Sequence, residues 1–171
     1  RETLWIMKMT IEKVLNNKAH RPWEMPNKNW KFYQEWNDAV FLHWQVDYDE
    51  LSKLVHPDLE IDLFEGKPWV SLVAFNMERI RPKNLPAFSP VSNFPEINIR
   101  TYVKYKGKTG VHFLSIEAAK RLSCKIAKSI SELPYRFSRM SRKNECFTSK
   151  NIDFGDSFRA RYSIGKKVVH K

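Results

Sequence analysis

The chain of 171 residues contains only two cysteines, Cys124 and Cys146. Two thiols cannot build a disulfide framework, and this pair lacks the C-x-x-C spacing of redox and metal-binding motifs. We therefore expect a reduced, cytoplasmic protein. In such a protein both cysteines are structural, one as a buried thiol on a helix and the other as a thiol on a strand.

Long apolar runs are also absent, since no stretch approaches the roughly 18 residues needed to span a bilayer. The opening residues, RETLWIMKMTIEKVLNN, do not read as a signal peptide because Lys8, Glu12 and Lys13 interrupt any apolar centre. Their apolar spacing predicts an amphipathic helix from Thr3 to Asn16. We expect residues 1–18 to form a helical extension and residues 19–171 to form one domain.

The common catalytic motifs are missing as well. The sequence has no G-x-G-x-x-G, P-loop, G-x-S-x-G or H-E-x-x-H segment. Its five histidines are scattered without the spacing of metal ligands, at His20, His43, His56, His112 and His170. We therefore expect neither a metal nor a cofactor, and the residues leave open whether the chain is an enzyme.

Acidic residues are scarce in the second half of the chain. Residues 76–171 carry 21 basic and 7 acidic side chains, whereas residues 32–75 carry 2 basic and 9 acidic ones. This asymmetry is typical of a nucleic-acid-binding module that uses its basic C-terminal half. It is equally typical of a solvated surface, and the lack of a compact Lys/Arg block favours the second interpretation.

The sequence does contain many strand-like segments and one long helical pattern. Asp47 and Glu50 predict a capping box that opens a short helix, and Ser115 predicts the start of a helix running to about Leu133. Strands are predicted over 30–36, 38–46, 59–64, 69–75, 94–103, 111–114, 135–140, 145–149 and 156–164, with 59–64 paired to 69–75 and a long loop over 81–95. The class is therefore α+β, mainly β, around an antiparallel sheet or barrel.

The segment FPEINIRTYV, residues 94–103, has a polar face. If it is a strand, side chains alternate, and Glu96, Asn98, Arg100 and Tyr102 share one side. Glu96 and Arg100 would lie roughly 13 Å apart, too far for a direct ion pair, so each needs other partners. Such a face is either solvated or lines a pocket.

Six segments follow one another in a specific order from about His20 to Tyr162: AHRPWEMP, VFLHW, VDYDELSKLVHPDLEIDLFEGKPWV, FPEINIRTYV, GKTGVHFLSIEAA and ELPYRFSRM. Together they resemble the YqjF-like family of uncharacterised bacterial proteins. That family is similar to acetoacetate decarboxylase, and DYDELSKLVHPDLEID is the clearest link. The resemblance implies an acetoacetate decarboxylase-like antiparallel β-cone or barrel with flanking helices and a central pocket.

The same resemblance implies a pair of candidate catalytic residues. It places Glu96 at the position of an active-site glutamate of the decarboxylase, so that the polar face of the strand lines the pocket. It places Tyr135 where the decarboxylase has its Schiff-base lysine. A tyrosine cannot form an imine with a ketone, so the resemblance leaves acid–base chemistry of a lyase or isomerase type.

The implied ligand is a small carboxylate or carbonyl compound. Arg100 or Arg136 would clamp the anion, since a guanidinium matches a carboxylate in geometry. The remaining implied ligand-binding residues are Asn98, Tyr102, His43 and His112.

A structural or assembly domain is the alternative, because large aromatic residues such as Trp69 and Phe75 usually fill a core. Family members continue for several strands beyond KKVVHK, so we expect this chain to lack their C-terminal strands. An open sheet edge would then invite pairing into a homo-oligomer.

Overall fold

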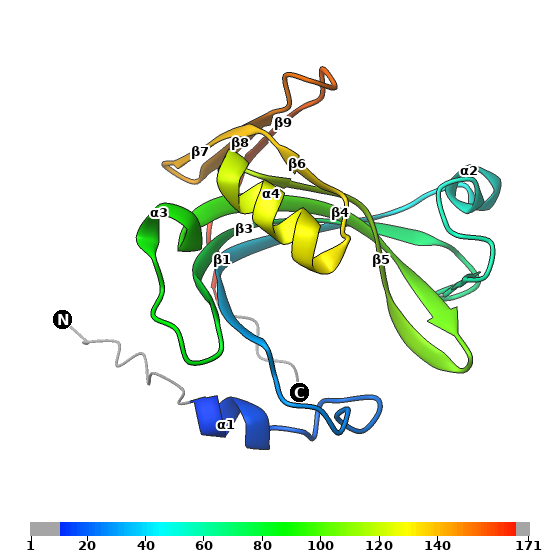
Figure 1. Ribbon diagram of the computed structural model, residues 1–171. Coiled ribbons are helices and arrows are strands. Elements are labelled where there is room, and N and C mark those ends of the chain that lie inside the picture. Colours follow the sequence, from blue (N-terminus) through cyan, green and yellow to red (C-terminus); the bar gives the residue numbers. More distant parts are fainter. Residues whose placement is uncertain (1–10, 167–171) are drawn as a thin grey trace.

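The computed structural model describes residues 11–166, which form two sheets and four helices (Figure 1). In chain order the elements are α1 (Ile11–Asn16), β1 (Phe32–Gln45), α2 (Tyr48–Ser52), β2 (Glu60–Ile61), β3 (Trp69–Pro82), α3 (Ser89–Ser92), β4 (Phe94–Tyr105), β5 (Lys108–Ala118), α4 (Arg121–Ser131), β6 (Tyr135–Phe137), β7 (Arg139–Lys143), β8 (Cys146–Lys150) and β9 (Ser157–Arg161). The prevalence of strands confirms the α+β, mainly β class. Of the helix predicted over residues 3–16, only the part from Ile11 lies within the described residues.

The main sheet has the strand order β1-β3-β4-β5-β6, and β2 adds to one end of β4. All its pairings are antiparallel except that of β5 with β6. Among residues 11–166 the order does not return to its first strand, so β1 and β6 are edges of a curved, open sheet. The predicted antiparallel sheet is confirmed, and this part of the chain does not close into a barrel.

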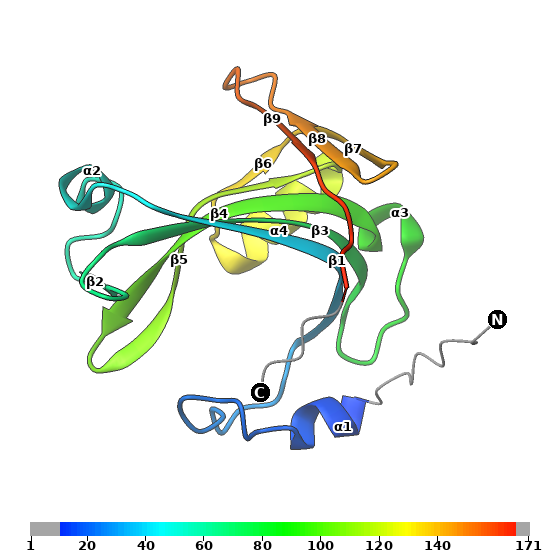
Figure 2. The ribbon, with the colours of Figure 1, turned by 180° about the vertical axis from the view of Figure 1, so that it is seen from behind.

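Each face of the main sheet is covered by a different layer (Figures 1 and 2). One face carries Val73, Phe75 and Phe94, which form a core cluster with Cys124 of α4. The other face carries Leu72, Ala74 and Ile97, which pack against Phe147 of the small sheet β7-β8-β9. The nearly continuous apolar run VSLVAF of β3 fits this arrangement because a strand covered on both sides needs apolar residues at consecutive positions.

The long helix starts later than the sequence predicts. Ser115 belongs to β5, which continues to Ala118, and α4 begins only at Arg121 after Lys120 as N-cap. The reason is pairing on both sides, since residues 115–118 bond to β4 and residues 116–118 also pair with β6. The prediction for Ser115 was wrong because these tertiary hydrogen bonds outweigh a local capping preference.

Two other local predictions also need correction. The segment predicted as strand 59–64 pairs through β2 with β4, not with 69–75. The loop predicted over residues 81–95 contains the short helix α3 and the ends of β3 and β4.

The predicted cap of α2 is half confirmed. The Asp47 side chain accepts a hydrogen bond from the Glu50 backbone N–H at 3.0 Å, as an N-cap does. The Glu50 carboxylate, however, pairs with Lys53 in place of reaching back to residue 47. The second hydrogen bond of the predicted capping box, from Glu50 to the backbone of Asp47, is therefore replaced by the exposed ion pair of Glu50 with Lys53.

Candidate active site: a buried glutamate and a tyrosine beneath α4

Glu96 lies in β4 on the face of the sheet that α4 covers. Its neighbours across the sheet are Phe75 of β3 and Ala118 of β5, both fully buried. Glu96 itself is only 2% exposed. Because these apolar neighbours exclude water and disfavour the charged form, burial raises the pKa of Glu96 to about 8.

Tyr135 of β6 is the hydrogen-bonding partner of Glu96. The parallel pairing of β5 with β6 sets Tyr135 beside Ile116, and the phenol O–H donates to Glu96 Oε2 at 3.4 Å. This long bond lowers the pKa of Glu96, but by less than burial raises it. Burial, and then the nearby Glu96 carboxylate, raise the pKa of Tyr135, so the phenol remains a neutral hydrogen-bond donor. The two residues predicted to be catalytic therefore lie in contact.

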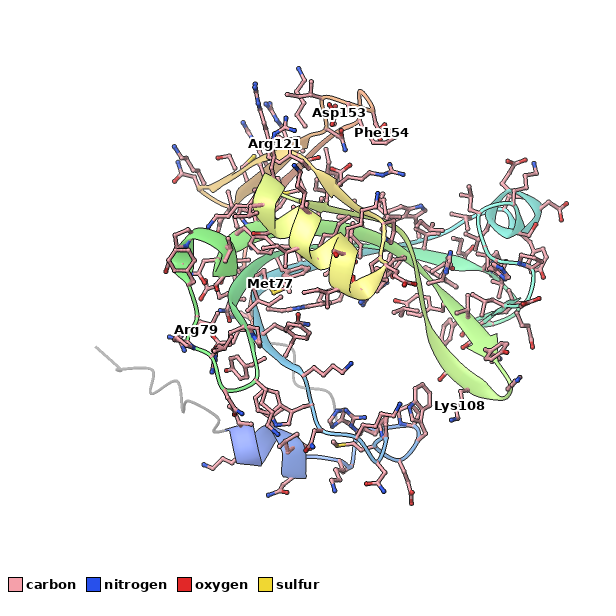
Figure 3. The ribbon with its side chains drawn as sticks, viewed as in Figure 1. Met77, Arg79, Lys108, Arg121, Asp153 and Phe154 are labelled. Atoms are coloured by element: carbon pink, nitrogen blue, oxygen red, sulfur yellow. The ribbon has the colours of Figure 1, made fainter. Side chains whose placement is uncertain are left out.

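A cavity of about 490 Å³ opens beside this pair, between the sheet and α4. Figure 3 shows Met77, one of its wall residues, beneath α4. The wall is mainly apolar and consists of Phe32, Gln34, Trp36, Met77, Ile80, Arg81, Pro82, Val91, Phe94, Glu96, Phe113, Ile116, Ser123, Ile126, Ala127, Ile130, Ser131, Leu133 and Tyr135. We call it the Glu96 cavity.

The apolar stripe of α4 lines this cavity more than it fills a core. Ile126 and Ile130 belong to the cavity wall and remain 43% and 56% exposed. Part of the apolar face of α4 therefore faces open space. Lys125 and Lys128 of α4 are exposed and are not wall residues of the Glu96 cavity, so neither takes the place of the decarboxylase lysine.

The two cysteines are free, as predicted. Cys124 is buried on α4, where its thiol donates to the backbone oxygens of Ala118 at 3.6 Å and Arg136 at 3.3 Å. Burial raises the pKa of this thiol, and the neighbouring Glu96 raises it further. Cys124 therefore stays protonated and packs in the core between α4 and the sheet.

Asn98 and Arg100 follow Glu96 on the same face of β4. Asn98 is buried, and neither its amide nitrogen nor its amide oxygen has a hydrogen-bond partner within the described structure. The Asn98 side chain lowers the pKa of Glu96, against the larger effect of burial. The Arg100 guanidinium lies 5.6 Å from the centre of the Phe41 ring, and its buried Nε is also unpaired within residues 11–166.

His43 and Tyr102 lie at a second cavity and not at the first. Ser71 of β3 connects them, with its Oγ 2.6 Å from both His43 Nδ1 and the Tyr102 hydroxyl. This cavity, about 420 Å³, is lined by His43, Asp62, Leu63, Phe64, Trp69 and Tyr102. The polar face of residues 94–103 therefore serves two cavities, one at Glu96 and one at Tyr102. Sequence reasoning missed Ser71, although it is the one polar residue within the run VSLVAF.

Arg136 and His112 lie on the other side of the sheet. Arg136 stands opposite Glu117 in the strand register, so its side chain points to the other side of β6 from Tyr135. Its guanidinium lies over the Phe154 ring, 4.1 Å from the ring centre. His112 pairs with Thr101, whose side chain alternates with that of Arg100. The structure does not bring these two predicted ligand-binding residues to Glu96, and the cation that it places in the cavity wall is Arg81.

A second buried glutamate, Glu117, has hydrogen-bond donors at both of its carboxylate oxygens. Its carboxylate accepts hydrogen bonds from Ser138 at 2.6 Å, Ser149 at 3.2 Å and Asn151 at 2.8 Å. Within the described part of the chain, the one hydrogen bond to the Glu96 carboxyl group is the long bond from Tyr135. Glu96 is thus the buried carboxyl group that has unused capacity and a cavity in front of it. Within residues 11–166 no cluster of His, Cys, Asp and Glu could hold a metal ion, and no helix is long and apolar enough to cross a membrane.

Comparison with known proteins identifies relatives of this arrangement. A family model of uncharacterized conserved proteins, DUF2071, matches residues 33–171. The uncharacterized protein YqjF of Bacillus subtilis (strain 168) is 41% identical over 121 residues, which are 70% of this chain and 50% of YqjF. The chain thus spans half the length of this relative.

Solved structures with a similar fold include acetoacetate decarboxylase from Legionella pneumophila, with a TM-score of 0.57 at 15% identity over 81% of this chain and 53% of the decarboxylase. They also include MppR, an enduracididine biosynthesis enzyme solved with the condensation product of pyruvate and imidazole 4-carboxaldehyde. MppR has a TM-score of 0.51 at 12% identity, over 67% of this chain and 42% of MppR. These likenesses confirm the predicted acetoacetate decarboxylase-like fold.

Proposed function

From the premise that this chain belongs to the DUF2071 family of uncharacterized conserved proteins, we propose that its Glu96 cavity binds a small carboxylate or carbonyl compound. The observation that carries the proposal is a buried glutamate, incompletely hydrogen-bonded, at the wall of a mainly apolar cavity. MppR, of similar fold, is known in complex with a pyruvate-derived product, which supports testing oxo-acids first.

The protonation state of Glu96 suits such a ligand. With a pKa of about 8 the carboxyl group is mostly protonated at neutral pH, so it donates a hydrogen bond to a carbonyl or carboxylate oxygen. A charged glutamate would instead repel an anion. Tyr135 supplies a second neutral donor beside it, and Arg81 supplies a positive charge in the same wall.

The same pair can move protons. A carboxyl group whose pKa lies near the working pH exists in both forms and can accept a proton from a carbon next to a carbonyl and return it elsewhere. The O–H of Tyr135 would stabilise the oxyanion that forms. We therefore propose proton-transfer chemistry of an isomerase or lyase type, without an imine intermediate, because neither residue carries an amine.

The test is a thermal-shift titration of the parent and Glu96→Gln proteins with pyruvate, acetoacetate and a panel of oxo- and hydroxy-carboxylates. A ligand that binds only the native state stabilises it by about 2.7 kcal/mol when present at about 100 times its Kd. We expect the stabilisation of the parent to be reduced in Glu96→Gln, because an amide N–H is a weaker hydrogen-bond donor than a carboxylic acid O–H.

Tyr102→Phe serves as the matched control, since Tyr102 lies on the same strand but lines the other cavity. Its response to the acids should equal that of the parent. Equal responses of the parent and Glu96→Gln to every stabilising acid would remove Glu96 from the binding site.

A further inference from the structure

The second cavity is walled mainly by aromatic rings. Trp69 begins β3, Tyr102 lies near the end of β4, and Phe64 lies in the turn that leads to β3. The Phe64 and Trp69 rings meet edge to face, with their centroids 6.4 Å apart and their planes at 73°. The cavity volume of about 420 Å³ lies within the range typical of small-molecule sites. In Figures 1 and 2 its strands lead to the end of the molecule that carries α2 and β2.

One carboxylate stands among these rings. Asp62 belongs to the cavity wall, and its Oδ1 forms an ion pair with Lys104 Nζ at 2.7 Å. Lys104 does not itself belong to the wall, as far as residues 11–166 show. The other titratable groups in the wall are His43 and Tyr102, both tied to Ser71. The charged group in the wall is therefore a carboxylate that is paired with Lys104 outside the wall.

The Ser71 hydrogen bonds hold the wall in place. They join three adjacent strands, because His43 lies in β1, Ser71 in β3 and Tyr102 in β4. The 2.6 Å hydrogen bond to Ser71 holds the Tyr102 hydroxyl, and with it one edge of the ring, in the wall. A rigid aromatic wall loses little conformational entropy when a ligand binds.

We propose that this second cavity is an aromatic cage that binds an organic cation, namely a quaternary or methylated ammonium group. The faces of aromatic rings carry partial negative charge and attract such cations, and a carboxylate beside them adds to the attraction. An anion would meet both the ring faces and Asp62 unfavourably. A neutral apolar molecule would fit the rings but would gain nothing from the carboxylate.

Isothermal titration calorimetry with choline and with 3,3-dimethyl-1-butanol tests the proposal directly. The two molecules have nearly the same shape and differ in the positive charge. We expect choline to bind at least about fivefold more tightly than the neutral alcohol, a difference typical of a cation in contact with aromatic rings. Equal affinities, or no binding of choline up to about 10 mM, would overturn the proposal.

Phe64 offers a matched pair of variants at one exposed position. Phe64 is 65% exposed in a turn, so the protein should fold with either replacement. Phe64→Leu should weaken choline binding about fivefold, whereas Phe64→Tyr, which keeps an aromatic face, should change it less than about twofold. Identical affinities for the two variants would also contradict the proposal.

The two cavities are tested independently of each other. Glu96 is six strand residues from Tyr102, roughly 20 Å along β4. Glu96→Gln should therefore leave choline affinity unchanged. A loss of acid binding with choline binding intact would concern the Glu96 cavity alone, and the reverse result would concern the aromatic cage alone.

Discussion

Glu96 and Glu117 are the same residue type, both buried in one sheet, yet their surroundings differ. Glu117 is held by two serine hydroxyls and one asparagine amide. Glu96 has apolar neighbours and one long hydrogen bond from a tyrosine. A carboxyl group that is buried with so little compensation favours its neutral form, and this raised pKa has a measurable consequence for stability.

Stability should fall with rising pH because of Glu96. The pKa of this group is about 8 in the folded protein and about 4.5 without the fold, so between these values the native state holds a proton that the unfolded chain has lost. The stabilisation is complete below pH 4.5 and disappears progressively as the pH rises to about 8, by about 1 kcal/mol per pH unit. Glu96→Gln has no proton to lose and should lack this dependence.

Denaturant unfolding of the parent and Glu96→Gln at pH 6, 7, 8 and 9, read out as free energy of unfolding, isolates the effect. Titrating groups that do not interact with Glu96 are common to both proteins and cancel in the difference. We expect the free energy of unfolding of the variant to rise relative to that of the parent as the pH rises from 6 to about 8. A difference that stays constant from pH 6 to pH 9 would show that the environment of Glu96 does not disfavour its charge.

At the scale of elements, the Glu117 hydrogen bonds connect the small sheet to the main one. Glu117 lies in β5, whereas Ser149 lies in β8 and Asn151 directly follows β8. Asn151 also accepts hydrogen bonds from the backbone of Asp153 and Phe154, which shapes the β8–β9 loop seen in Figure 3. Together with the apolar contact of Phe147, this buried polar network docks β7–β9 onto the sheet.

Asn151→Ala should therefore loosen the small sheet selectively. The change leaves one oxygen of the buried Glu117 without its partner, which costs about 1–3 kcal/mol. Relative to the parent, amide hydrogen exchange should accelerate more in β7–β9 than in β3 and β4. Thr148→Ala is the control, because the bond of Thr148 to Ser141 is solvent-exposed and its loss should cost about 0.5 kcal/mol or less. Equal losses in the two variants would count against this docking role.

The sequence predicted individual strands better than their meeting points. Alternation in residues 94–103 correctly set Glu96, Asn98, Arg100 and Tyr102 on one face, because that periodicity is a local property. It could not reveal that the face serves two cavities, since this depends on the curvature of the sheet and on the register shift between β4 and β5 after Ile99.

Side-chain contacts between different strands could not be predicted from local sequence patterns either, because they depend on how the strands pair. The link from His43 through Ser71 to Tyr102 spans three strands whose register the sequence does not encode locally. The extension of β5 through Ser115 likewise depends on β6, which follows α4. By contrast, the family resemblance brought Tyr135 to Glu96 because it carries information about tertiary structure that periodicity lacks.

At the scale of the whole molecule, a group of exposed cations lies on the outer face of the small sheet. In the small sheet, residues whose neighbours along the strand pack inward point out to solvent. The register aligns five exposed cations on that face: Arg139, Lys143, Lys150, Arg159 and Arg161. This outer face is separated by the sheet from the Glu96 cavity, so its charge is an independent property of the molecule.

This face predicts weak, sequence-independent binding of duplex DNA that salt abolishes. Each phosphate contact releases about 0.9 condensed counterions, so five contacts give a slope of about −4.5 in log K against log salt. Fluorescence anisotropy with two unrelated 20-base-pair duplexes from about 20 to 200 mM salt should give the same slope for both.

The double variant Arg159→Gln with Arg161→Gln should reduce the magnitude of this slope by about 2. The control is Lys125→Gln with Lys128→Gln on α4, which removes the same charge elsewhere and should reduce the slope less. Tight binding of one duplex that persists at 200 mM salt would instead assign the main function to this surface.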